Sequence, residues 1–175
     1  MLYLGSIDPT EKDWIQMIQT WLPLPSFENS IAALHINELK MQRLHVIELL
    51  EFFHDPEESS LPLLYEDHGL TDEHGLVQMW RGYELQLIEY GMELCEKYGS
   101  IRGKPDPLLA KLSVHLDWAN TDDSPMTKPN WFGDIDFHLS HQSALLKINN
   151  SHYGKFFLWD GDRPLIYPKS DHIAP

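Results

Sequence analysis

Cysteine and basic residues are both scarce in this chain of 175 residues, and each scarcity excludes a class of protein. Cys95 is the only cysteine, so the chain has no intrachain disulfide and no thiolate metal cluster. Lysine and arginine number 13 against 27 aspartates and glutamates, which gives a formal net charge of -14. Proteins that bind duplex DNA normally carry clustered lysines and arginines. The deficit therefore favours a local nucleic-acid contact, a small ligand, or a protein partner met through the acidic surface.

Long apolar runs are missing as well. No stretch approaches the roughly 18–20 apolar residues of a membrane span, and the chain opens without a signal-peptide pattern. We therefore expect a cytoplasmic protein of a bacterium or of a phage-infected cell, with no membrane partner. The sequence also lacks a glycine-rich phosphate loop and a Gly-x-Ser-x-Gly nucleophile turn. No cofactor and no metal are expected.

The pattern that is present is helical. Hydrophobic residues at 42% and charged residues at 23% are ordinary globular values, and this length suits one domain with a sizeable core. We expect an all-α, single-domain bundle of five to six helices over residues 1–175, without βαβ units. The predicted helices cover residues 10–21, 29–53 (with a break near Asn37), 74–98, 106–118 and 134–148, and residues 158–175 form an irregular tail.

Residues 76–98 repeat apolar side chains at steps of four and three, as one face of a continuous helix does. One turn of this predicted helix carries Trp80, Arg81, Tyr83 and Glu84 together. A stacking aromatic ring, a planar cation and a carboxylate are groups that can hold a nucleobase or nucleotide. The same spacing also fits a core helix whose Arg81 and Glu84 pair with polar groups elsewhere. The sequence leaves both interpretations open.

Two histidines lie three residues apart in the helix predicted over residues 134–148. His138 and His141 share a helical face, as do Ser140 and Ser143. A metal site would need a third ligand from another helix, and nothing nearby in the sequence supplies one. The other interpretations are histidines that bond the backbone or a carboxylate, and histidines that contact a phosphate or a base.

The second predicted helix concentrates long polar side chains in an otherwise apolar segment. Lys40, Gln42, Arg43 and His45 lie within six residues of one another. They form either a solvated helical face or part of a binding site.

Several segments recur in an order that is typical of a known family. In chain order they are Met79-Trp80-Arg81-Gly82-Tyr83-Glu84, Trp131-Phe132-Gly133-Asp134, Phe137-His138, Ser140-His141-Gln142-Ser143, Leu145-Leu146, His152-Tyr153-Gly154 and Tyr167-Pro168. Together they resemble an uncharacterised bacterial and phage branch of the pyrimidine-dimer DNA glycosylases of the endonuclease V type. The resemblance covers roughly residues 27–168. It implies an all-helical fold.

The resemblance also implies a reaction. In the characterised enzymes an N-terminal amine attacks the sugar C1′ with the help of a glutamate, and a Schiff base forms after a nucleotide is flipped out. Here Leu2 is bulky and leaves Met1 in place, so the nucleophile would be the Met1 amine. His45 occupies the position where the branch carries an acid, which leaves Glu84 as the candidate carboxylate.

The leading hypothesis is a glycosylase-like protein that binds a nucleobase, a nucleotide or damaged DNA and cleaves an N-glycosidic bond. The alternative is a non-catalytic phage or bacterial protein, regulatory or acting in counter-defence. Such a protein would sequester a small nucleotide or block a protein partner with its acidic surface. The residues assigned to catalysis are Glu84, His45 and Met1, and those assigned to ligand binding are Arg43, Trp80, Arg81, Tyr83, His138, Ser140, His141, Ser143 and Lys147.

Overall fold

The structure is a computed structural model that describes residues 20–54, 75–120 and 128–148. Every regular element within these ranges is a helix, which confirms the all-α class. Thr20 and Trp21, predicted to end a helix, are not helical, and the rest of that helix and the 158–175 tail lie outside the described residues. The elements are α2 (Phe27–Ala33), α3 (Ile36–His54), α4 (Gly75–Trp80), α5 (Glu84–Arg102), α6 (Leu108–Asn120) and α7 (Ile135–Ile148).

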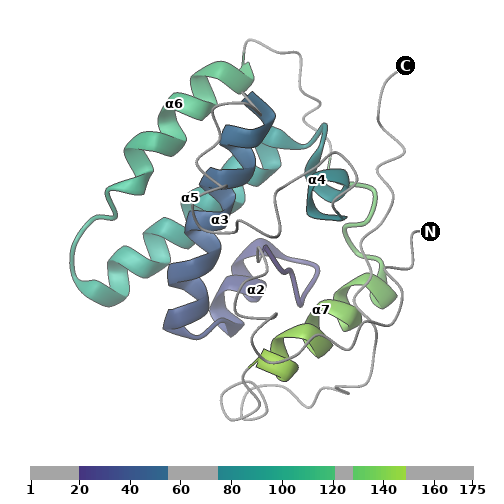
Figure 1. Ribbon diagram of the computed structural model, residues 1–175. Coiled ribbons are helices and arrows are strands. Elements are labelled where there is room, and N and C mark those ends of the chain that lie inside the picture. The colour runs from purple at the N-terminus through teal and green to yellow at the C-terminus, as the bar shows by residue number, and fades with distance from the viewer. Residues whose placement is uncertain (1–19, 55–74, 121–127, 149–175) are drawn as a thin grey trace, which may run out of the picture.

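Helices α3, α5 and α6 pack against one another, with α6 at the edge of the molecule (Figure 1). A glycine permits their close approach, because a Cβ atom at Gly91 of α5 would lie 2.7 Å from Val46 Cγ1 and 3.1 Å from Leu112 Cδ2. Helix α2 also packs against α5. Among the described helices, none combines the length and the apolar composition needed to cross a membrane.

The helix predicted over residues 29–53 is two helices, and the break falls slightly before the expected position at Asn37. Helix α2 ends because Leu34 adopts an extended conformation (φ -78°, ψ 140°), with its N–H donating to the Ile31 carbonyl. His35 then caps α3, since its Nδ1 accepts the Asn37 N–H at 3.3 Å. A side-chain acceptor in this position satisfies one of the free N–H groups of a helix start.

The prediction of one continuous helix over residues 74–98 is wrong, because the helix is interrupted between Trp80 and Glu84. Helix α4 ends at Trp80, and α5 begins at Glu84 after a turn in which Gly82 has a φ of 82°. A left-handed conformation of this kind suits glycine and ends the helical hydrogen-bond pattern. Trp80, Arg81, Tyr83 and Glu84 therefore do not share one helical turn.

Helix ends near α6 and α7 follow the local capping signals. Asp106 Oδ1 accepts the Leu108 N–H at 3.0 Å at the start of α6, and Asp134 Oδ1 accepts the Asp136 N–H at 3.0 Å at the start of α7. Helix α5 was predicted to end near Gly99. It continues to Arg102 instead, and Gly103, whose φ is 69°, is its C-cap. Gly99 has a packing role instead, because a Cβ atom there would lie 2.8 Å from the Lys104 carbonyl oxygen.

Candidate functional site

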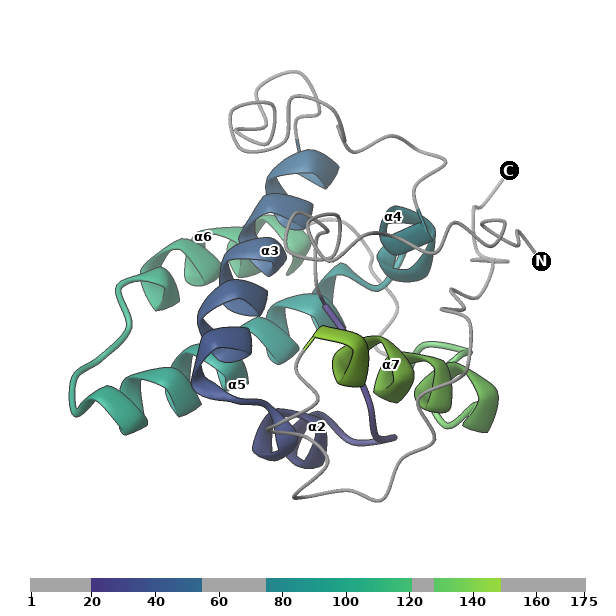
Figure 2. The same ribbon diagram turned by 60° about the horizontal axis from the view of Figure 1, so that its bottom comes forward.

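A segment outside the regular helices, residues 20–24, crosses α7 and is held by side chains from four helices, α2, α4, α5 and α7 (Figure 2). Leu22 lies at its centre. The Leu22 N–H donates to His141 Nδ1 at 3.1 Å, and the Leu22 carbonyl lies 2.7 Å from His138 Nδ1. Both histidines are buried. The two histidines predicted to share a helical face therefore bind the backbone N–H and carbonyl of the same residue, Leu22.

The neighbouring backbone groups of this segment are satisfied in the same way. The Trp21 carbonyl accepts the Tyr90 hydroxyl at 3.3 Å, and the Pro23 carbonyl accepts the Gln142 amide at 2.8 Å. Ser30 Oγ accepts the Leu24 N–H at 3.0 Å and donates to the Leu24 carbonyl at 2.8 Å. Buried backbone groups outside regular structure need such partners. Three polar residues of the segments that carry the family resemblance, His138, His141 and Gln142, thus stabilise the fold.

The hydrogen bonds of His138 define its tautomer. A carbonyl oxygen only accepts, so Nδ1 carries the proton, and Nε2 accepts the Gly133 N–H at 3.0 Å. Burial lowers the pKa of His138, which keeps the ring neutral. Both ring nitrogens of His138 are occupied by the backbone. Among the described residues, no group of three histidine, cysteine or acidic side chains is arranged to hold a metal ion.

The two aromatic residues predicted to stack a base are buried. Trp80 is 0% exposed and Tyr83 is 2% exposed. Trp80 donates its indole N–H to Thr20 Oγ1 at 3.0 Å and stacks on Tyr90, with ring centroids 6.1 Å apart and an interplanar angle of 16°. The Tyr83 hydroxyl accepts the Asn130 N–H at 3.4 Å. In this conformation both rings pack within the protein core.

The turn between α4 and α5 places Arg81 and Glu84 near one end of α3. The Arg81 guanidinium carbon lies 5.7 Å from the centre of the Phe53 ring. Glu84 accepts the Gly82 N–H at 3.1 Å, so its carboxylate stabilises the turn that separates the two helices. Both side chains are partly exposed.

Arg43 lies elsewhere, in a corner between α3, α5 and α6. It donates to the Asp106 carboxylate at 3.1 Å, and its guanidinium carbon lies 4.2 Å from the centre of the Tyr98 ring. Arg43 and Phe53, the neighbour of Arg81, are ten residues apart on α3, or roughly 15 Å along the helix axis. The structure therefore does not bring Arg43 and Arg81 into one site.

The remaining predicted residues are placed as follows. Ser140 Oγ donates to the Phe137 carbonyl at 2.7 Å, and Ser143 Oγ donates to the Leu139 carbonyl at 3.1 Å. These bonds lie within α7. Lys147 belongs to α7, and the structure does not describe its side chain. Met1 lies outside the described residues.

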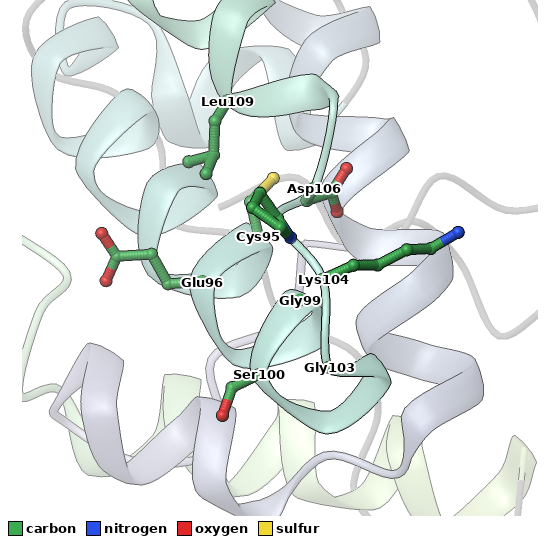
Figure 3. Close-up of a pocket in the computed structure, with 9 residues that line it drawn as sticks. Cys95, Glu96, Gly99, Ser100, Gly103, Lys104, Asp106 and Leu109 are labelled. Atoms are coloured by element: carbon green, nitrogen blue, oxygen red, sulfur yellow. The ribbon is translucent and has the colours of Figure 1, made fainter.

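A hollow of about 450 Å³ lies beside the Arg43–Asp106 pair, where α5 turns into α6 (Figure 3). Cys95, Gly99, Lys104 and Asp106 are among its lining residues. Burial, followed by the Asp106 carboxylate, raises the pKa of the Cys95 thiol to about 12. A thiol with this pKa stays protonated at neutral pH, so it is not an activated nucleophile.

Sequence reasoning missed part of a buried polar stripe on α3, which we call the polar face of α3 and which consists of Glu38, Gln42, His45 and Glu48. These side chains are 5%, 0%, 1% and 7% exposed, respectively. Their spacing of four, three and three residues places successive members on neighbouring turns of the same side. Burial and the neighbouring Glu51 carboxylate raise the pKa of Glu48 to about 7. The helical spacing of these polar residues was visible in the sequence, whereas their burial follows from the packing of α3.

No family model, curated protein or solved structure matches this chain. The described residues define an all-α protein with two buried polar regions. One holds the segment 20–24 in place. The other, the polar face of α3, contains buried side chains with acid–base chemistry.

Proposed function

We propose that this chain is a pyrimidine-dimer-glycosylase-like protein that binds a nucleobase or nucleotide and acts on an N-glycosidic bond. The observation that carries the proposal is the polar face of α3, where the buried carboxyl of Glu48 lies one turn from the buried imidazole of His45. An acid and a base on one helical face are suited to general acid–base catalysis. The all-helical fold agrees with the resemblance in segments such as Trp80-Arg81-Gly82-Tyr83-Glu84.

Hydrolysis of an N-glycosidic bond requires a group that donates a proton to the leaving base and accepts a proton from water. Water adds to the sugar C1′, the bond from C1′ to the base nitrogen breaks, and the leaving base takes a proton. The water molecule releases one proton, so the acid is restored. Glu48, with a pKa raised to about 7, suits both steps at neutral pH. We assign this role to the polar face of α3 in preference to Glu84, whose carboxylate is engaged by the Gly82 N–H.

A second candidate function is a non-catalytic protein that sequesters a small nucleotide or blocks a protein partner. Two observations favour it. Trp80, His138 and His141, which were assigned to ligand binding from the sequence, are buried and bonded to the segment 20–24. The net charge of -14 also opposes duplex DNA at ordinary salt concentrations.

Base release distinguishes the two functions. Free bases would be quantified by chromatography after incubation of the protein with nucleosides, nucleotides and dimer-containing DNA. The glycosylase proposal expects base release that disappears in Glu48→Gln and persists in Glu89→Gln, a control in which an exposed acid is changed. Borohydride trapping adds a second readout. Attack by water forms no Schiff base, so base release without a crosslink is expected, and a crosslink to DNA would indicate the Met1 amine as the nucleophile in place of water. Binding without base release or crosslinking would support the non-catalytic function.

A further inference from the structure

The row of titratable side chains on α3 continues beyond Glu48 toward the surface. Glu48, Glu51 and His54 follow one another at steps of three residues, so each lies beside the next on adjacent turns of the helix. Their exposure increases in the same order, because Glu48 is buried, Glu51 is half-buried and His54 is exposed. A half-buried carboxylate therefore lies between the buried acid of the proposed function and the end of the helix.

Helix α6 packs against α3 and adds a further titratable group at this end of the bundle. The rings of His54 and His115 meet edge to face, with centroids 6.5 Å apart and an interplanar angle of 81°. Trp118, three residues further along α6, meets the His54 ring edge to face at 4.8 Å. These contacts hold His115 beside the part of α3 that carries Glu51 and His54.

The Glu51 carboxylate acts on a neighbour in each helix. Burial raises the pKa of Glu48 to about 7, and the like charge of Glu51 acts in the same direction. Burial lowers the pKa of His115, and Glu51 opposes this change because its negative charge favours the charged ring. The cations His54 and Lys111 act on His115 in the same direction as burial. One carboxylate thus influences the proton affinity of two groups on two helices.

We propose that Glu51 is a positioning residue for the proposed reaction, because its carboxylate couples the buried acid Glu48 to His115 at the junction of α3 and α6. The inference rests on the proposed function and concerns the control of proton transfer at the same site. A negative charge at Glu51 opposes the loss of a proton from Glu48, so it favours the protonated form that the leaving base requires. Protonation of His115 adds an opposite charge beside Glu51 and weakens this effect.

NMR titration of the full chain tests the inference, with the Glu48 carboxyl carbon and the His115 ring protons as probes. Glu51→Gln keeps the shape of the side chain and removes its charge. It should lower the pKa of Glu48 by about 0.3 or more, the shift expected from losing a like charge one turn away on a helix. It should also lower the pKa of His115, because the carboxylate that favours the charged ring is lost.

Two further variants separate charge from shape and position. Glu51→Asp keeps the charge, so it should preserve most of both pKa values. Glu89→Gln removes the same charge from an exposed site on α5 and should change neither value. An unchanged pKa of Glu48 in Glu51→Gln would overturn the inference, and so would an equal shift in Glu89→Gln. An unchanged pKa of His115 would likewise overturn the coupling to α6.

The pH dependence of base release gives a functional readout of the same coupling. The rate should decline at high pH as Glu48 loses its proton, and Glu51→Gln should move this decline to lower pH by the amount measured by NMR. A merely structural role for Glu51 would change the rate without moving the decline, and this result would overturn the inference. If the pKa values move as expected but no substrate releases a base, the coupling stands and the proposed function fails.

Discussion

His138 and His141 both bind Leu22 through Nδ1, which carries a proton in His138 and none in His141. His138 Nδ1 donates to the Leu22 carbonyl at 2.7 Å, and His141 Nδ1 accepts the Leu22 N–H at 3.1 Å. Both arrangements require a neutral imidazole, because a protonated ring has two donors and no acceptor. The position of the segment 20–24 is therefore linked to pH, and this linkage gives the first prediction.

Acid should destabilise the protein through His138. Its pKa is lowered from 6.5 by burial, so below that pH the unfolded chain binds more protons than the folded one. This contribution to the free energy of unfolding is complete above pH 6.5 and declines as the pH falls below that value. We expect His138→Gln, which keeps a neutral donor, to lose the dependence. Denaturant unfolding from pH 5 to pH 8 would measure the difference between the two proteins, and a difference that does not vary with pH would contradict the prediction.

Glu48 should have the opposite effect on stability. Its pKa is raised from 4.5 to about 7, so the folded state favours the protonated acid and loses stability as the pH rises through this interval. Glu48→Gln should therefore stabilise the protein at pH 8 by on the order of 1–3 kcal/mol. The gain should shrink toward zero near pH 4, where both states are protonated. Denaturant unfolding at the two pH values checks this, and an equal gain at both would indicate that the effect is not due to titration of Glu48.

The Arg43–Asp106 pair should tolerate joint replacement better than single replacement. Arg43→Met leaves the Asp106 carboxylate buried with no cation beside it, which should cost about 3–5 kcal/mol. Adding Asp106→Asn should recover a large part of this loss. The asparagine is neutral and keeps an oxygen that can accept the Leu108 N–H at the start of α6. Equilibrium unfolding of the single and double variants measures the coupling, and simple additivity of the two changes would rule out a paired contribution.

The local sequence pattern was sufficient to predict most of the helices. It was insufficient to predict the break at Gly82 between α4 and α5. The starts of α6 and α7 were predictable because Asp106 and Asp134 are capping residues close in sequence to the N–H groups they bind. The break between α4 and α5 was missed because the apolar spacing from Trp80 to Tyr83 and Leu87 continues across it. The three-residue step from Trp80 to Tyr83 is compatible with a helix and equally with a turn.

The candidate site was harder to predict because its partners are distant in sequence. His138 and His141 were correctly paired on one helical face, but Leu22 is separated from them by 116 and 119 residues. No local pattern encodes that contact. Glu48 was missed for another reason: its chemistry comes from burial among other helices, and burial of a single glutamate is a property of the packed fold.

The close approach of α3, α5 and α6 at Gly91 gives the last prediction. Gly91→Ala would raise the helix propensity of α5 by about 1 kcal/mol. The new Cβ atom, however, would lie 2.7 Å from Val46 Cγ1 and 3.1 Å from Leu112 Cδ2, so the helices would have to separate. Overpacking of this kind costs about 1–3 kcal/mol and should outweigh the propensity gain.

Gly103→Ala is the matched control for this substitution. Gly103 has no atom within 4 Å of an added Cβ, and its cost comes only from the backbone φ of 69°. That cost should be about 1–2 kcal/mol. The two variants should also differ in kind, because only Gly91→Ala disturbs the packing around Val46, on the helix that carries the polar face. Gly91→Ala should therefore reduce base release as well as stability, whereas Gly103→Ala should change stability alone. Melting curves and base-release assays on both variants would test this, and equal loss of base release in the two would show that the packing at Gly91 does not position the polar face.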